Sequence, residues 1–216
     1  MMAIRYTKGE ELANSASHGI GIIFGIVAGV ILMEAAIANG NPWAIGSVPL
    51  YLFGMLASYI SSTFYHSCTS PKRKAKLRKF DHAAIYLHIA GTYSPITLIT
   101  LREVGWWGWG LFIFVWLCAA LGVLLSFTKL KEHSNLETTC FVLMGATILL
   151  AFQPLTSIFS PLGEMNIIYW ILAGGASYVI GALFYSWKSI NYMHSIFHLF
   201  CLGGSVCHAI AIYLVL

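Results

Sequence analysis

The sequence contains very little charge. Only 9% of its 216 residues are Asp, Glu, Lys or Arg, whereas 58% are hydrophobic. Soluble domains carry roughly 25% charged residues, so this chain has too few polar side chains to cover a surface that faces water. We therefore expect an integral membrane protein. Repeated apolar runs of about 20 residues predict an all-α protein and exclude a β-barrel, whose strands would alternate in short segments.

The chain also lacks the marks of a disulfide framework and of a secretory signal. Its five cysteines are scattered along the sequence and include no C-x-x-C pair, so neither disulfides nor a thiolate zinc site is expected. The opening residues MMAIRYTKGEELANSASHG contain no apolar core and no small-residue cleavage site. We expect no removable signal peptide before the first hydrophobic segment.

Seven apolar segments are present, each close to the ~20 residues that cross a bilayer. They cover residues of about 19–38, 44–67, 81–101, 106–128, 137–155, 164–186 and 190–215. The intervals between them are short, and none could hold a soluble domain. The sequence thus predicts a single seven-transmembrane helix bundle over residues 1–216, with kinks at Pro95 and Pro154.

The basic residues indicate how the bundle lies in the membrane. With seven spans, all but one of the Lys and Arg residues fall on the side of the N-terminus, and only Arg102 falls opposite. They are Arg5, Lys8, Lys72, Arg73, Lys74, Lys76, Arg78, Lys79, Lys129, Lys131 and Lys188. The positive-inside rule then predicts a multi-pass protein of the cell membrane, with a cytoplasmic N-terminus and its C-terminus across the membrane. The stretch PKRKAKLRK could also contact anionic lipid headgroups, although a topology signal is the simpler interpretation.

This topology gathers polar residues from three helices at one membrane depth. His194 and His198 lie early in the last span, Ser62 and His66 end the second span, and Asp81, the sole aspartate, begins the third. All these positions are on the predicted cytoplasmic side. Ionisable groups at membrane depth are costly and usually functional. We therefore interpret the five residues as one site.

The spacing of the histidines suits a metal ion. His194 and His198 are four residues apart, so their rings project from one helix face. Three imidazoles with an open fourth position form the ligand set of a catalytic zinc site, and a nearby carboxylate such as Asp81 could accept a proton from water there. H-x-x-x-H lacks the glutamate of the H-E-x-x-H metalloproteases. The alternatives are an interfacial His66, and an Asp81 that pairs with neighbouring basic residues or caps its helix.

The other histidines are assigned weaker roles. His18 is close enough in depth to support the site, although a packing role is the alternative. His88 lies deeper and is expected to pack by hydrogen bonding, whereas His208 is ~21 Å along the last helix from His194, too far for the same ion. His82 and His133 are expected at the surface.

Four blocks of the sequence resemble the hemolysin III family, within the progestin and adipoQ receptor group. They are EELANSASHGIG, SSTFYH, KFDHAAIYLHIAGTYSP and HSIFHLFCLGGSVCHAIAIYL. The resemblance spans essentially the whole chain and implies seven helices with a cytoplasmic N-terminus. In the related adiponectin receptors it implies a zinc ion held by three histidines near the cytoplasmic face. Those positions correspond here to His66, His194 and His198, with Ser62 and Asp81 beside them.

The resemblance implies several activities. Alkaline ceramidases of the wider superfamily place Ser, His and Asp similarly, which implies a zinc-dependent hydrolase of a lipid amide, with Asp81 and Ser62 as catalytic residues and a role in membrane homeostasis. Its partners would be the bilayer and a membrane lipid or fatty-acyl substrate, with no nucleic acid. The alternatives are a membrane-lytic or pore-forming protein and a receptor-like protein in which zinc is structural.

Overall fold

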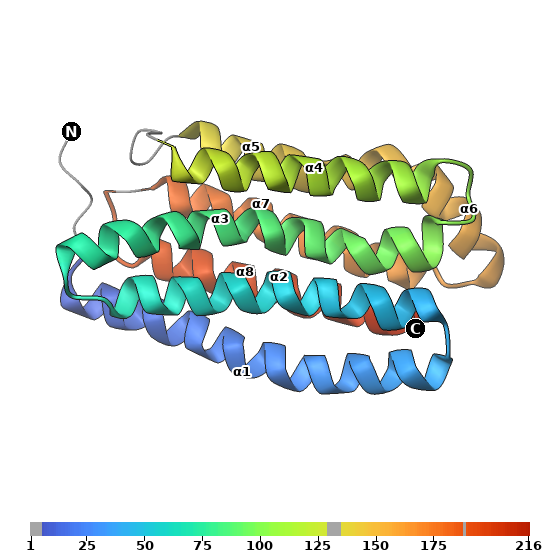
Figure 1. Cartoon of the computed structure of the whole chain (residues 1–216), viewed down its shortest axis with the longest axis horizontal. Helices are drawn as coiled ribbons and strands as arrows, with labels where there is room; N and C mark the ends of the chain where they lie inside the picture. Colours follow the sequence, from blue (N-terminus) through green and yellow to red (C-terminus); the bar gives the residue numbers. More distant parts are fainter. Residues whose placement is uncertain (1–5, 129–134, 188) are drawn as a thin grey trace.

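The computed structural model describes residues 6–128, 135–187 and 189–216, and every regular element among them is helical (Figure 1). In chain order the elements are α1 (Lys8–Asn39), α2 (Pro42–Ser67), α3 (Pro71–Pro95), η1 (Ile96–Leu101), α4 (Trp107–Phe127), α5 (Asn135–Ala146), η2 (Thr147–Ala151), α6 (Phe152–Leu162), α7 (Met165–Ser186) and α8 (Met193–Leu214). Within the described ranges, seven helices are long and apolar enough to cross a membrane, with η1 continuing α3 and the run from α5 to α6 forming one span. The predicted seven-span fold is confirmed.

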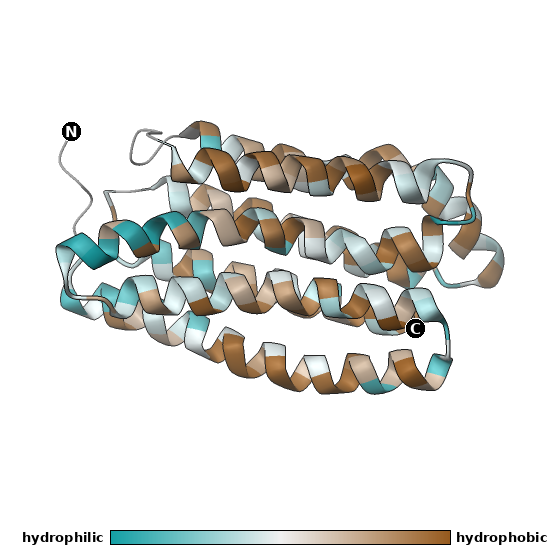
Figure 2. Ribbon diagram, in the orientation of Figure 1, coloured by the Kyte–Doolittle hydropathy of each residue, from teal (hydrophilic) through white to brown (hydrophobic). Residues whose placement is uncertain are grey.

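The spans lie side by side, with the start of α1 and the end of α8 at opposite ends of the bundle (Figure 1). We call the end at which α1, α3 and α8 begin and α2 ends the N-terminal end. Hydrophilic residues gather there, most visibly on the first turns of α3 (Figure 2). Its predicted cytoplasmic location remains a prediction. Four of the basic residues used for it, and one predicted surface histidine, lie outside the described residues: Arg5, Lys129, Lys131, Lys188 and His133.

The first helix begins eleven residues before the predicted boundary at residue 19. Thr7 caps it: the Thr7 hydroxyl accepts from the Glu10 backbone N–H at 3.2 Å, and the Glu10 carboxylate accepts from the Thr7 N–H at 2.8 Å. Several polar side chains of the first turns, including Asn14 and Ser17, are buried inside the bundle. The polar composition of this stretch thus reflects a buried site rather than a segment in water.

The third and fifth spans also exceed their predicted bounds. α3 begins at Pro71 rather than at residue 81, because proline is favourable in a first helical turn, where its missing N–H costs nothing. Both predicted kinks adjoin a departure from α geometry: a π-helix follows Pro95, and a 3₁₀ segment precedes Pro154. The fifth span continues to Leu162 rather than to residue 155 and ends at Gly163, which has a φ of 72°.

Glycine allows α2 and α3 to touch along their backbones. A Cβ atom added to Gly54 would lie 2.3 Å from the Leu87 carbonyl oxygen, and one added to Gly91 would lie 2.6 Å from the Leu50 carbonyl oxygen. This packing holds the end of α2, which carries Ser62 and His66, against the start of α3. An apolar core drawn from most of the helices, including α1, α2, α6, α7 and α8, fills the bundle, with Leu32, Met55, Ile168 and Ile212 among its buried members.

Candidate metal centre

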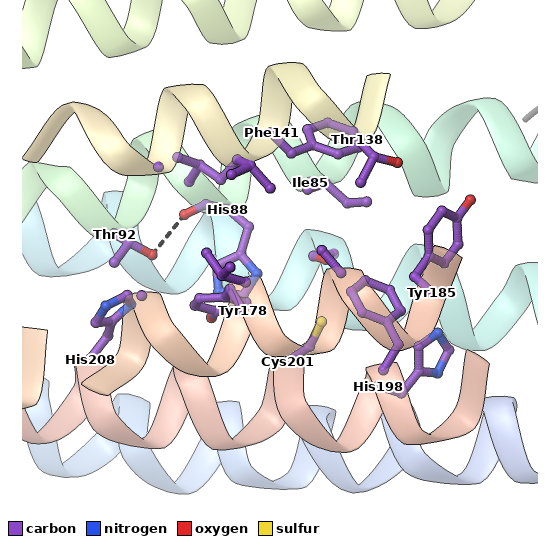
Figure 3. A pocket seen from close by; sticks show the side chains of 18 of the residues that line it. Ile85, His88, Thr92, Thr138, Phe141, Tyr178, Tyr185, His198, Cys201 and His208 are labelled. Atoms are coloured by element: carbon purple, nitrogen blue, oxygen red, sulfur yellow. Dashed lines mark hydrogen bonds between the residues drawn. The ribbon is translucent and has the colours of Figure 1, made fainter. Parts of the chain in front are cut away.

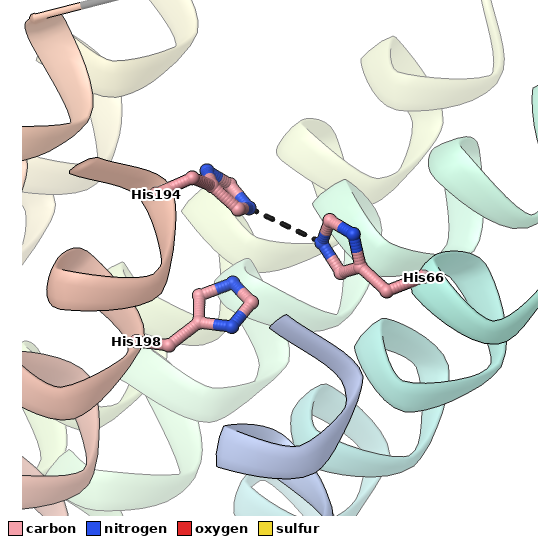
Figure 4. A group of neighbouring side chains, drawn as sticks. All are labelled: His66, His194 and His198. Atoms are coloured by element: carbon pink, nitrogen blue, oxygen red, sulfur yellow. Dashed lines mark hydrogen bonds between the residues drawn. The ribbon is translucent and has the colours of Figure 1, made fainter. Parts of the chain in front are cut away.

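Three histidines meet at the N-terminal end of the bundle. His66 lies in the last turn of α2, and His194 and His198 lie in the first two turns of α8. The Nε2 atoms of His66 and His194 are 3.2 Å apart, and the three rings converge on a common space (Figure 4). One ligand atom from each residue lies within 4.8 Å of the other two. The structure therefore brings together the three histidines that the sequence singled out.

A carboxylate from α1 orients His66. The Glu11 Oε2 atom lies 2.8 Å from His66 Nδ1, and its Oε1 atom lies 2.8 Å from Lys74 Nζ. Because a carboxylate only accepts hydrogen bonds, this contact places the His66 proton on Nδ1. The Nε2 lone pair is then directed away from Glu11, toward the other histidines. Carboxylate–histidine pairs of this kind commonly fix the ring and tautomer of a metal ligand.

The backbone of α1 orients His198 in the same way. Its Nδ1 atom lies 3.1 Å from both the Asn14 carbonyl oxygen and the Ser17 hydroxyl oxygen. The Ser17 hydroxyl already donates to that carbonyl at 2.9 Å, so its oxygen acts as an acceptor. The network thus assigns the proton to Nδ1 of His198 and leaves Nε2 with its lone pair. The ring of His18 stacks on His198 with centroids 3.5 Å apart.

The donor set fits a metal ion. Two nitrogen ligands that bind one tetrahedral zinc at ~2.0–2.1 Å lie roughly 3.3 Å apart, close to the 3.2 Å between the Nε2 atoms of His66 and His194. Two imidazole lone pairs at this separation repel one another unless a proton or a cation lies between them. His66 and His198 are almost fully buried, at 3% and 1% exposure. The three histidines could therefore hold a metal ion.

A cavity of about 430 Å³ runs from this cluster into the bundle. At its polar end it is lined by Ser62, Asp81, His194 and His198, and further in it is walled mainly by apolar side chains of α3, α5, α7 and α8 (Figure 3). A cavity that is polar at one end and apolar along the rest of its length suits a lipid chain.

The predicted acidic residue faces this cavity. Asp81 is buried and lies beside Ser62, although no well-aligned hydrogen bond joins the two among the described residues. Asp81 stands ten residues after Pro71, so it does not cap α3. Lys79, one of the neighbouring basic residues with which Asp81 could pair, instead donates to the Phe127 carbonyl oxygen at 3.3 Å. Asp81 is not part of the group of residues that could hold the ion, which consists of His66, His194 and His198.

The remaining histidines are placed as follows. His18, predicted near the site, lies against His198, and His88, predicted to pack, has its Nε2 atom 3.4 Å from Ser205 Oγ. His208 lies at the far end of the cavity, as expected. The prediction for His82 was wrong: its side chain is 17% exposed and pairs with Glu137 at 2.7 Å, because this turn of α3 faces α5 rather than solvent.

Sequence reasoning missed Glu11 and Asn14 of α1, and Tyr6 just before that helix. Glu11 and Asn14 hold the rings, and Tyr6 covers them, with its ring centroid 5.1 Å from that of His194. Burial raises the pKa of the Tyr6 hydroxyl above its usual range, so Tyr6 is neutral. A signal was present: the T-x-x-E capping box at Thr7 and Glu10 marks an earlier helix start, which places Glu11 and Asn14 on one buried face.

The family model described as "Haemolysin-III related" matches residues 6–209, nearly the whole chain. The chain belongs to the hemolysin III family. Among the relatives of this family member, "Hemolysin-3" of Bacillus cereus is 39% identical over 196 residues, covering 91% of this chain and 87% of the relative. The "Hemolysin-3 homolog" of Bacillus subtilis (strain 168) is 38% identical over 200 residues, covering 93% and 91%. The human "Monocyte to macrophage differentiation factor" is 27% identical over 212 residues, covering 94% and 83%.

Proposed function

We propose that this hemolysin III family member is a zinc-dependent hydrolase of a membrane-lipid amide that acts in membrane homeostasis. One observation carries the proposal: the three-histidine cluster stands at the polar end of an apolar cavity, which also contains a buried carboxylate and a buried hydroxyl. His66, His194 and His198 would hold the ion. The cavity would hold the acyl chain, so that the bond to be cleaved lies at the cluster.

Zinc in this position would supply a Lewis acid that polarises a carbonyl oxygen and makes water more acidic. The protein supplies the rest. Asp81, which lines the cavity, accepts one proton from the attacking water, and Ser62 beside it orients the reacting groups. Water oxygen bonds to the carbonyl carbon, the carbon–nitrogen bond breaks, and Asp81 returns its proton to the leaving nitrogen. The products are a fatty acid and an amine, and Asp81 is restored.

A structural role for zinc is the second candidate. The observation that favours it is that the cluster joins α2 to α8 while α1 supplies the residues that orient the rings. An ion there would tie α2 to α8 without turnover, and α1 would be held only through its contacts with the rings. The membrane lysis suggested by the name of the Bacillus cereus relative, or a receptor-like activity, would be compatible with this role.

The first experiment measures metal content and turnover in the same purified preparations. We expect about one zinc per chain by mass spectrometry, and its loss from His194→Ala/His198→Ala. His208→Ala serves as a matched control, because it removes a cavity histidine of the same helix outside the cluster. Asp81→Asn should keep zinc and lose hydrolysis of N-acyl lipid amides by at least about 100-fold, as expected for loss of a general base.

The outcomes separate the two candidates. Zinc binding with Asp81-dependent amide hydrolysis supports the hydrolase. Zinc binding with no turnover in the wild type, together with a lower melting temperature after chelation, supports the structural role. A wild-type chain that takes up no zinc after supplementation would overturn both.

A further inference from the structure

Three tyrosines from separate parts of the chain surround the polar end of the cavity. Tyr6 precedes α1, Tyr65 lies in the last turns of α2, and Tyr185 lies in the last turn of α7; all three line the cavity. Tyr185 is seen at the same end of the cavity as His198 (Figure 3). Each is within electrostatic reach of Asp81, and Tyr6 is within reach of the other two tyrosines. Phenol hydroxyls therefore gather where the proposed reaction would take place.

The hydroxyls of Tyr6 and Tyr65 form no hydrogen bond with any part of the chain that the structure describes. Some buried tyrosines of this protein are paired: the Tyr59 hydroxyl donates to Ser205 Oγ at 2.6 Å, and the Tyr93 hydroxyl donates to a backbone carbonyl oxygen of α5 at 2.7 Å. A buried phenol normally has such a partner. Tyr6 and Tyr65 are partly buried and line the cavity, so their hydroxyls are positioned to donate to a ligand there.

The charges around these hydroxyls indicate which ligand. At this end the cavity lining includes one cationic side chain, Arg78, against two carboxylates, Asp81 and Glu137, and the second carboxylate pairs with His82 at 2.7 Å. Lys74 is held by Glu11 at 2.8 Å and does not line the cavity. A phosphate-bearing headgroup would need an excess of cationic donors. Neutral donors in a lining without an excess of cationic side chains favour an uncharged polar group.

We propose that Tyr6 and Tyr65 bind the polar group of an uncharged lipid amide, each donating a hydrogen bond to one of its oxygens. The assignment of an amide rests on the function proposed above. The position of Tyr6 supports it, because its ring lies against the rings of both His66 and His194, with centroids 5.8 and 5.1 Å away. Its ring thereby lies beside the cluster at which the bond would be cleaved. The two tyrosines thus set headgroup specificity, while the apolar wall accepts the chain.

The test is equilibrium binding to the full chain, which does not require turnover. N-palmitoylethanolamine is the polar probe, hexadecane is a probe of the chain alone, and palmitoyl lysophosphatidic acid is the charged probe. Tyr6→Phe and Tyr65→Phe keep each ring and remove only the hydroxyl. Tyr169→Phe, at a 64% exposed position outside the cavity lining, is the matched control. Zinc content and melting temperature of each variant check that the fold and the metal centre are retained.

We expect each cavity variant to bind the amide roughly three- to tenfold more weakly, which is the value of one hydrogen bond. Hexadecane binding and the Tyr169→Phe variant should be unchanged, and the wild type should prefer the amide to the phosphate-bearing lipid. Unchanged amide binding in both variants, or tighter binding of the charged lipid, would overturn the inference while leaving the hydrolase intact. The expected binding pattern in a wild type that shows no turnover would instead uphold the inference and remove the hydrolase. A wild type that binds no amide would overturn both.

Discussion

Replacing Glu11 by glutamine tests whether α1 prepares the metal ligands. The carboxylate holds the His66 proton on Nδ1 across 2.8 Å, so that Nε2 presents its lone pair. A glutamine amide can donate to Nδ1 as well as accept from it, and donation would move the proton to Nε2, where it blocks metal binding. Loss of such an outer partner typically lowers metal affinity by about 10–100-fold, or about 1.4–2.7 kcal/mol. We expect a loss in this range for Glu11→Gln.

The assay is competition for zinc between the purified protein and a chelator of known affinity at constant pH. Lys74→Met is the control, because it removes the other partner of Glu11 and leaves the contact with His66. The Lys74 and Glu11 side chains are 23% and 22% exposed, so their ion pair contributes at most about 1 kcal/mol, and Lys74→Met should lower zinc affinity less than about fivefold. Zinc affinity of Glu11→Gln within about twofold of wild type, or an equal loss in both variants, would refute the reasoning.

Two further predictions concern the packing that holds the site. Gly54→Ala should lower the free energy of unfolding by about 1–3 kcal/mol, since its Cβ would meet the Leu87 carbonyl oxygen at 2.3 Å. Gly19→Ala is the control, because a Cβ at Gly19 would meet only open space. Equal melting temperatures of the two variants in detergent would contradict the prediction. Tyr93→Phe should destabilise by about 1–3 kcal/mol, because the hydroxyl accepts from the Ile148 N–H at 2.7 Å and this donor would lose its partner. Faster hydrogen exchange at Ile148 should accompany the loss, and unchanged exchange would show that another group replaces the hydroxyl.

The number of spans and the meeting of the three histidines could be predicted because both follow from simple patterns. Low charge and seven apolar runs leave one architecture, and that architecture alone brings His66 to the level of His194 and His198. The helix starts could not be found by hydropathy. Polar residues at the head of α1 are indistinguishable by composition from a segment in water, whereas in the bundle Asn14 is fully buried. Only the cap at Thr7 distinguishes the two cases.

Which side chains pair depends on how each helix is rotated about its own axis, and a largely apolar sequence specifies this rotation poorly. His82 was expected at the surface because it follows a basic stretch, yet its turn faces Glu137 of α5. The pairing of Glu11 with His66 joins residues 55 positions apart, and no spacing rule connects them. Tyr6 was overlooked for the same reason, since it precedes the first span and contacts rings from the second and the last.

The separation of the ligands along the chain has a consequence for biosynthesis. His66 and His194 are 128 residues apart, and both remaining ligand positions lie in the final helix. At roughly 5–20 residues per second, the ribosome completes this interval in about 6–26 s, during which the second span is already in the membrane with a single ligand. If the three histidines hold a metal ion, its stable capture must follow insertion of α8. A chain that stops short of this helix retains six spans but only one of the three histidines, so metal content would distinguish completed molecules from fragments that are otherwise well inserted.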